Sequence, residues 1–478
     1  MTGSVSASRV ATLVGDFPRS PAYAGLADAL VMVVGDGRIP LETRLPSERE
    51  LTEALDVSRT TVTRAYAILR EAGYAESRRG SGTFTRVPGG RSRAHDRALL
   101  PRADADRAID LNCAAPSAPP GVAQAYVDAV AELPAYLGGH GYFPAGLPRL
   151  QQAIATTYAD RGLPTDPEQI MVTSGALAAV SIVADALTGA GDRVLVESPV
   201  YPNATNALRR AGARLCPAPV DPDGWDLDTT AALLRQAAPR LAYLIPDFQN
   251  PTGHLMSDAQ RERYAAALRR AHTVPVVDEA HQALPLEGQQ MPRPFAAYAH
   301  EAITIGSASK GFWGGLRIGW IRAPHALMEP LTHTRVSMDL GAPVLEQLVL
   351  VRLLAESEQV LAVNRARLRD QRDALVAAVG DRLPDWRFTT PTGGLALWCQ
   401  LPHPLATSVA TEAEQHGVVV APGPVFAAEG GLDRFLRIPW TRPAGELTTA
   451  VDVLAEAWST VQRRPTSRAG RSARVMVA

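Results

Sequence analysis

The sequence has almost no lysine. A count along the chain divides its 48 basic residues into 47 arginines and one lysine, Lys310. Arginine is always protonated and cannot act as a free amine, whereas lysine can lose its proton and form an imine with an aldehyde. A codon bias toward arginine explains why lysine is rare, but it does not explain why this one is kept. Retention for function is therefore our first hypothesis for Lys310, with chance as the alternative.

Cysteine and long apolar runs are scarce too. The three cysteines, Cys113, Cys216 and Cys399, are scattered and not paired at zinc-binding spacings, which argues against a disulfide framework or a metal site. No apolar run approaches the roughly 18–20 residues of a membrane span, and the N-terminus lacks the apolar region of a signal peptide. We therefore expect a soluble protein of the reducing cytoplasm, with no membrane association and no metal.

Neither sign of charge is in excess. The 48 basic residues face 49 acidic ones, and the formal net charge is -1. This balance excludes a protein that binds nucleic acid through bulk charge, although a locally basic module can lie within a neutral total. With 478 residues and 46% hydrophobic content, the chain is long enough for two or three domains with ample cores.

Residues 21–85 have the pattern of a helix-turn-helix followed by a β-hairpin. An amphipathic run covers residues 22–34, Ser47 is a candidate N-cap for a helix that ends at Leu55, and a further helix covers residues 58–72. Two helices with so short a connection are typical of a helix-turn-helix. Strand-forming residues then flank a glycine turn at residues 80–82, which predicts a hairpin, or wing.

This N-terminal region is locally basic. Residues 58–86 contain six arginines and two glutamates, a balance of +4, as expected of a surface that binds phosphates. Ser58, Arg59 and Thr61 at the start of the second helix offer polar groups where a recognition helix meets the major groove. Taken singly, such a helix start is more often a simple cap, and charged runs are usually solvated faces.

The order of these motifs resembles the winged helix-turn-helix of GntR-type bacterial regulators. LPSxRxL, VSRxTV and a GxGT wing occur here at that family's spacing, within a domain that we place at residues 15–88. The resemblance implies a partner, double-stranded operator DNA. It also implies that the DNA is contacted by Arg49, Arg59, Thr61, Arg64 and the wing around Gly82. To these we add Arg44, which precedes the first helix and could contact a phosphate, and Ser58 at the polar start of the second helix.

Beyond this module the composition changes twice. Residues 89–108 are rich in Arg, Asp, Pro and Gly without an apolar period, and we interpret them as a flexible linker. Apolar strands then alternate with Ala- and Leu-rich helices over residues 109–462, which predicts an α/β domain with a mostly parallel sheet buried on both faces. Residues 463–478 are interpreted as a basic, disordered tail.

Lys310 follows a strand of this α/β domain, where open sheets bind ligands. If the ligand is pyridoxal phosphate (PLP), an anion site, an acid for the ring nitrogen and groups that hold the ring are also needed. The helix start at Gly175 and Ala176 is a candidate phosphate site, and Asp278 follows the strand VPVV. A plain turn and a solvated loop acid are the alternatives. Further candidates for the ring and phosphate are Asn250, Ser307 and Arg317.

The α/β region resembles the fold type I aminotransferases, and the whole chain resembles the MocR family, which joins a GntR module to such a domain. SGA, ESPVYP, QNPTG, DxAx and SxSK with an arginine seven residues later occur in that family's order. The resemblance implies that Lys310 forms a Schiff base with PLP, Asp278 pairs with the ring nitrogen and Arg437 binds an effector or substrate carboxylate. It implies further cofactor contacts from Gly175, Ala176, Tyr201, Asn250, His281, Ser307 and Arg317, and from Tyr142, which reaches the partner subunit's phosphate in these homodimers.

Two positions depart from this pattern. His281 stands where many relatives carry a tyrosine that donates to the phenolic oxygen of PLP, and Leu177 stands where a polar residue is frequent. Histidine could still donate, but we expect it to titrate near neutrality and to tune the cofactor differently. The departures put efficient transamination in doubt.

These observations lead to one preferred function and two alternatives. We expect a PLP-dependent transcriptional regulator that senses PLP, an amine or an amino acid through its aminotransferase-like domain. A working class I/II aminotransferase with an appended DNA-binding module is the main alternative, and a cofactor-free dimerisation scaffold is the other. The sequence does not specify the effector, the operator or the sign of regulation.

Overall fold

The computed structural model describes residues 4–35, 39, 43–78, 80–86, 108–221 and 223–463. Residues 89–107 of the linker predicted at 89–108 and residues 464–478 of the tail predicted at 463–478 lie outside these residues. Among the described residues, no helix combines the length and the apolar character that crossing a bilayer requires. The same residues contain no cluster of His, Cys, Asp and Glu that could hold a metal ion.

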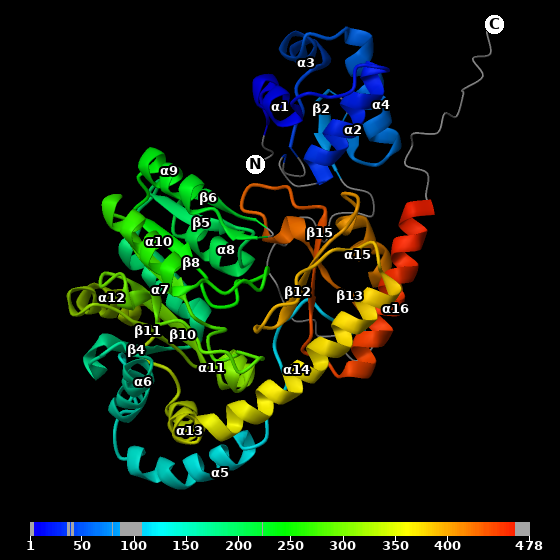
Figure 1. The fold of residues 1–478 in the computed structure, drawn as a ribbon. Coiled ribbons are helices and arrows are strands. Elements are labelled where there is room, and N and C mark those ends of the chain that lie inside the picture. Colours follow the sequence, from blue (N-terminus) through cyan, green and yellow to red (C-terminus); the bar gives the residue numbers. More distant parts are fainter. Residues whose placement is uncertain are drawn as a thin grey trace, which may run out of the picture.

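The N-terminal domain is a winged helix-turn-helix, as predicted (Figure 1). Ser47 caps α3 through a reciprocal bond with Glu50, and Ser58 caps α4. Between these helices Asp56 adopts a left-handed conformation with φ 50°, which produces the sharp turn. The elements are α1 (Ala7–Val14), α2 (Ala22–Gly35), α3 (Glu48–Leu55), α4 (Arg59–Glu71), β1 (Ala75–Arg78) and β2 (Gly82–Thr85).

One apolar core holds this domain together. Leu26 and Leu30 from α2, Leu51 from α3 and Val62 from α4 are buried against one another. Helix α1, which precedes the boundary that we predicted at residue 15, adds Val10 to the same core. The wing strands pair from Ala75↔Thr85 to Arg78↔Gly82.

The large domain is built on an eight-stranded sheet of order β4-β11-β10-β9-β8-β5-β6-β7. The neighbours from β10 to β6 run parallel, whereas β11 is antiparallel to both β10 and β4. This is the α/β class with a mostly parallel sheet that the sequence predicts. The strands are β4 (Ile170–Thr173), β5 (Arg193–Ser198), β6 (Arg214–Asp221), β7 (Gly224–Trp225), β8 (Leu241–Leu244), β9 (Val274–Asp278), β10 (Ile303–Ser307) and β11 (Gly319–Arg322).

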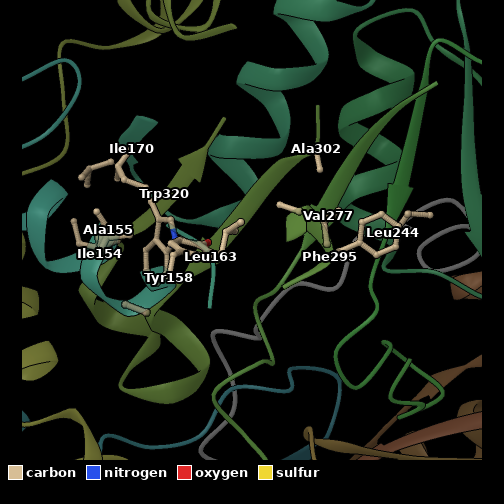
Figure 2. Close-up of a cluster of buried hydrophobic side chains, with 14 of the residues drawn as sticks. Ile154, Ala155, Tyr158, Leu163, Ile170, Leu244, Val277, Phe295, Ala302 and Trp320 are labelled. Atoms are coloured by element: carbon tan, nitrogen blue, oxygen red, sulfur yellow. The ribbon is translucent and has the colours of Figure 1, made fainter. Parts of the chain in front are cut away.

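Both faces of this sheet are covered by helices. Alternate strand residues face opposite sides, so Leu244 and Val277 join the core beneath α6 and α10, whereas Tyr243 and Val276 join the core beneath α7 and α8. Figure 2 shows part of the first core, in which the Trp320 indole donates to the Tyr158 hydroxyl at 3.0 Å. The helices are α5 (Val122–Glu132), α6 (Pro148–Asp160), α7 (Ala176–Leu187), α8 (Pro202–Arg210), α9 (Leu227–Ala237), α10 (Asp258–Arg270), α11 (Ala308–Gly311), α12 (His325–Met338) and α13 (Val344–Ala355).

A smaller C-terminal part packs around a separate core. The long helix α14 runs from α13 to this part (Figure 1), where β12, β15 and β14 form a three-stranded sheet and β13 pairs with β3. Its elements are β3 (Ile109–Asp110), α14 (Ser357–Arg382), β12 (Ala396–Gln400), α15 (Ala406–Gln415), β13 (Val418–Val419), β14 (Ala421–Pro422), β15 (Phe435–Pro439) and α16 (Ala444–Arg463).

Candidate functional site

Lys310 lies in the single turn α11, directly after β10. Its Nζ donates to the carbonyl of Ala114 at 2.6 Å. Burial lowers the pKa of the Lys310 amine, and the nearby guanidinium of Arg437 lowers it further. A lowered pKa increases the neutral, nucleophilic fraction of the amine at a given pH, which suits imine formation with an aldehyde.

Asp278 ends β9, the strand next to β10 in the sheet. One carboxylate oxygen accepts from the Tyr243 hydroxyl at 2.6 Å, and the other accepts from the Ala280 N–H at 2.9 Å. Burial raises the pKa of Asp278, and the bond from Tyr243 opposes this rise. Sequence reasoning missed Tyr243, whose only signal was a hydroxyl within the apolar strand β8 that pairs with β9.

The loop after β8 carries Asn250 and is braced by residues of the ESPVYP and QNPTG motifs to which the sequence analysis gave no role. The Gln249 amide donates to Glu197 at 3.1 Å and to the Pro199 carbonyl at 2.7 Å, and its oxygen accepts from the Thr252 hydroxyl at 2.8 Å. Burial raises the pKa of Glu197 to about 7. This network ties the Asn250 loop to the segment that leads to Tyr201.

The turn before α7 has the shape of a phosphate site. Gly175 has φ +98°, and a Cβ there would lie 2.5 Å from Nη2 of Arg317, which itself donates to the Ser174 carbonyl at 3.0 Å. Helix α7 has no side-chain cap, so its first N–H groups stay available to an anion. Ser307 instead caps α11 through the Ser309 N–H. The glycine, the helix start and the arginine together fit the phosphate of PLP.

Arg437 is a buried guanidinium on β15. Its Nη1 donates to Asn250 Oδ1 at 3.3 Å, its Nη2 donates to the Asn112 carbonyl, and it lies 4.8 Å from the centre of the Phe426 ring. Burial lowers its pKa to about 10. Within the described part of the chain its Nε has no hydrogen-bond partner, and the charge of Asp110 acts on the guanidinium only as a minor influence that raises its pKa. A buried cation of this kind is suited to binding an anionic ligand group.

His281 differs from our expectation. Burial lowers its pKa to about 3, so it stays neutral at physiological pH and does not titrate near neutrality. Its Nδ1 lies 3.2 Å from the Phe248 carbonyl, which can only accept, so the proton of the neutral ring sits on Nδ1. The other nitrogen, Nε2, then has a lone pair and no hydrogen to donate to a phenolic oxygen.

The two tyrosines implied by the family resemblance have different surroundings. Tyr201 precedes α8, and burial raises the pKa of its hydroxyl to about 12, with a smaller contribution from the charge of Asp278. Tyr142 is 58% exposed, and its ring stacks on His140 with 5.8 Å between centroids. The structure therefore places Tyr201 near the site and leaves Tyr142 on the surface of the chain.

The residues predicted to contact DNA lie on α3, α4 and the wing. Arg59 begins α4 with a side chain that is 78% exposed and lies 3.7 Å from Glu48, and Arg64 lies over the Tyr23 ring. The Ser58 hydroxyl caps α4 by accepting from the Thr61 N–H, and it also forms a hydrogen bond of 2.8 Å with the Thr61 hydroxyl. In the wing, Gly82 has φ +106° and leaves room for the Arg44 side chain, whose Nε would lie 2.9 Å from a Cβ there. Arg49 pairs with Glu53 on the surface of α3.

Comparison with protein families identifies both domains of the chain. Residues 117–454 match the model of class I and II aminotransferases, and residues 22–85 match that of the gntR family of bacterial regulatory proteins. The chain is 31% identical over 398 residues to a probable rhizopine catabolism regulatory protein, MocR, of Rhizobium meliloti, covering 77% of this chain and 78% of that one. The chain belongs to the class I and II aminotransferase family, as a MocR-type regulator.

One further relative covers most of this MocR-type regulator, and a solved structure covers about three quarters of it. An uncharacterized HTH-type transcriptional regulator, YisV of Bacillus subtilis, is 29% identical over 461 residues, covering 88% of this chain and 92% of its own. The crystal structure of LysN, an α-aminoadipate aminotransferase of Thermus thermophilus complexed with N-(5'-phosphopyridoxyl)-L-leucine, matches with a TM-score of 0.69 at 27% identity, covering 76% of this chain and 96% of that one.

The residues present fit the cofactor that this family uses. The MocR-type domain holds a reactive amine at Lys310, a buried carboxylate at Asp278 and an anion turn at Gly175 on the same edge of one sheet. It is therefore a PLP-binding domain joined to a DNA-binding domain, and the chain is a transcriptional regulator with an aminotransferase-like domain.

Proposed function

We propose that this regulator senses an amino acid, or a related amine that carries a carboxylate, at PLP held by Lys310, and changes its operator binding in response. The observation that carries the proposal is Arg437, a buried guanidinium without a carboxylate partner among the described residues. Burying a charge without a counter-ion has a large free-energy cost. A ligand carboxylate that pairs with Arg437 would offset much of this cost, which favours binding of such a ligand.

The chain's own residues define what such a ligand needs. The Lys310 amine is the covalent attachment point, Asp278 would hold a proton on the ring nitrogen, and the turn at Gly175 with Arg317 would hold the phosphate. Bound PLP supplies an aldehyde that exchanges between primary amines. Arg437, which donates to Asn250 of the same site, adds selection for a carboxylate.

The proposed sensor is a homodimer. Helix α5 and the loop after it expose large apolar side chains, including Val127 at 63%, Leu137 at 71% and Tyr142 at 58%. An apolar surface of this kind on a single chain is typical of a protein interface. A second copy would cover it and would bring Tyr142 toward the partner's phosphate site, as the family resemblance implies.

The test measures binding of the full chain to DNA upstream of its own gene, first with and without PLP. With PLP present, L-alanine, ethylamine and acetate are then compared, because these probes carry both groups, only the amine and only the carboxylate. We expect L-alanine to change the affinity most. In Arg437→Met, alanine and ethylamine should become equivalent, while the visible absorption of bound PLP persists. Operator binding that is indifferent to PLP and to every amine would overturn the proposal.

A working aminotransferase is the second candidate. The joint presence of Lys310, Asp278 and Arg437 in one site supports it, and the neutral, non-donating His281 argues against efficient turnover. Steady transfer of amino groups to 2-oxoglutarate at the turnover of ordinary enzymes, of the order of 1–1,000 per second, would favour this candidate over the sensor.

A further inference from the structure

The chain enters the large domain through residues 109–114, here named the entry segment. Its first residues form β3, where the Ile109 N–H donates to the Gly417 carbonyl and the Leu111 N–H donates to the Val419 carbonyl, both at 2.8 Å. Asp110 then accepts from the Asn112 N–H at 2.7 Å, which fixes the bend after the strand. Along the sequence this segment follows the connection from the DNA-binding domain.

Three consecutive carbonyls of the entry segment accept side-chain hydrogen bonds. The Asn112 carbonyl accepts from Nη2 of Arg437, and the Ala114 carbonyl accepts from Nζ of Lys310 at 2.6 Å. The Cys113 carbonyl between them accepts from the Thr441 hydroxyl at 3.5 Å. The segment therefore binds both the amine and the guanidinium that the proposed function assigns to the cofactor and the ligand carboxylate.

We propose that the entry segment is an internal competitor of the ligands, and that their binding to Lys310 and Arg437 releases it and so passes the signal toward the DNA-binding domain. The inference rests on the proposed function and adds the route of regulation. The observation behind it is that the entry segment accepts hydrogen bonds from both Lys310 and Arg437. The same segment directly follows the connection from the DNA-binding domain.

Proton counting explains the release at Lys310. A lysine ammonium has three N–H groups. When the neutral amine condenses with the PLP aldehyde, a C=N bond forms, the aldehyde oxygen leaves as water together with both amine hydrogens, and the nitrogen of the neutral imine keeps none. The Ala114 carbonyl then loses the donor that it has here. At Arg437, a ligand carboxylate replaces a neutral carbonyl, and a charge-assisted bond between ions is the stronger of the two.

The proposed coupling between the ligand site and the interdomain connection acts through the contacts of the entry segment itself. The segment's other polar contacts include the Ile109 and Leu111 bonds to the Gly417 and Val419 carbonyls and the weak Thr441 bond, and Leu111 and Ala114 are buried in the C-terminal core. Loss of the bonds from Lys310 and Arg437 therefore removes part of its polar anchoring and leaves the apolar contacts in place. With these two bonds lost, the segment opens at a lower free energy than it does with them in place. Ligand binding thereby changes the freedom of the chain where the two domains connect.

Hydrogen–deuterium exchange of the full chain tests the inference on peptides that cover residues 109–116. Addition of PLP should speed exchange in these peptides by about tenfold, given the usual strength of a bond to a charged group, and L-alanine should speed it again. Lys310→Ala should show the faster exchange without PLP and no response to it. Unchanged exchange in wild type and in Lys310→Ala would overturn the inference.

A second variant pair separates the segment from the ligand residues. Thr441→Val removes the hydroxyl that holds the Cys113 carbonyl and touches neither Lys310 nor Arg437. It should speed exchange in the same peptides before PLP is added and keep normal PLP absorption. Thr448→Val is the control for the same change of residue type, because the Thr448 hydroxyl donates to the Ala444 carbonyl within α16, and it should leave exchange unchanged.

The two proposals can fail independently. If operator binding responds to PLP or alanine while exchange at residues 109–116 stays constant, the sensor stands and this route is wrong. If neither responds, the proposed function itself fails. If exchange responds but operator binding does not, the competitor contact exists without carrying a signal, and the regulatory part of the inference is overturned.

Discussion

Tyr243 donates its hydroxyl hydrogen to the carboxylate of Asp278 at 2.6 Å, between the neighbouring parallel strands β8 and β9. Burial raises the pKa of Asp278, and this bond counteracts the rise. A carboxylate that stays ionised is the form that can keep a pyridine nitrogen protonated. Tyr243 is therefore a positioning residue that acts on the cofactor through Asp278.

Tyr243→Phe should weaken PLP binding by about tenfold, since a hydrogen bond to a charged group contributes roughly 1.5–3 kcal/mol. The measurement is a PLP titration followed by visible absorption, repeated across pH. The midpoint of any carboxylate-linked transition should move to higher pH in the variant. Tyr264→Phe is the control, because the buried Tyr264 hydroxyl has no hydrogen-bond partner among the residues that the structure describes. Equal PLP affinity in wild type and Tyr243→Phe would contradict this role.

How much the sequence could predict differs between the fold and the site. Apolar strands alternating with helices predict a sheet covered on both faces, because burial on both sides removes the polar alternation of an open sheet. Lys310 and Asp278 could be placed because each lies at the carboxyl end of such a strand. The partner of Asp278 could not, because its contact depends on the pairing of β8 with β9, and strand register is a tertiary property.

The contacts of the entry segment were also beyond sequence reasoning. These contacts use the backbone carbonyls of Asn112 and Ala114. Because every residue has a backbone carbonyl, no residue type in the sequence indicates which carbonyls accept these bonds. The state of His281 was predicted wrongly for a related reason. Its side chain suggests a titratable donor, but burial and the Phe248 carbonyl determine its protonation.

His281 should make the folded state sensitive to acid. Its pKa is about 3 in the folded chain, against about 6.5 in an unfolded one. Between these pH values the unfolded chain binds the extra proton, so stability falls as the pH drops from 6.5 toward 3. One such group contributes at most about 1.4 kcal/mol per pH unit.

Urea unfolding at pH 7 and pH 5 measures this effect. His281→Asn should lose less stability between the two pH values than wild type, because asparagine does not titrate. The surface histidine variant His300→Asn should keep the wild-type difference. An identical pH dependence in wild type and His281→Asn would show that this histidine is protonated in the folded chain as easily as in the unfolded one.

The apolar face of α5 should be required for the dimer. Val127→Glu combined with Val130→Glu places two charges on residues that are 63% and 53% exposed in the single chain. Charges buried at an interface without partners cost several kcal/mol, so the double variant should sediment as a monomer at concentrations where wild type is dimeric. A dimer that tolerates both glutamates would place the interface elsewhere and would remove the support for a role of Tyr142 across it.

Operator binding should depend on Arg59 more than on any arginine outside the helix-turn-helix. Its exposed side chain begins α4, where a guanidinium reaches either a phosphate or a base edge. If Arg59 contacts a phosphate, Arg59→Ala should weaken binding to all sequences alike and reduce the salt slope by about 1. If it contacts a guanine, the loss should be about 1–3 kcal/mol and specific to one base pair. Arg9→Ala on α1 is the control, and equal losses in both variants would exclude α4 as the recognition helix.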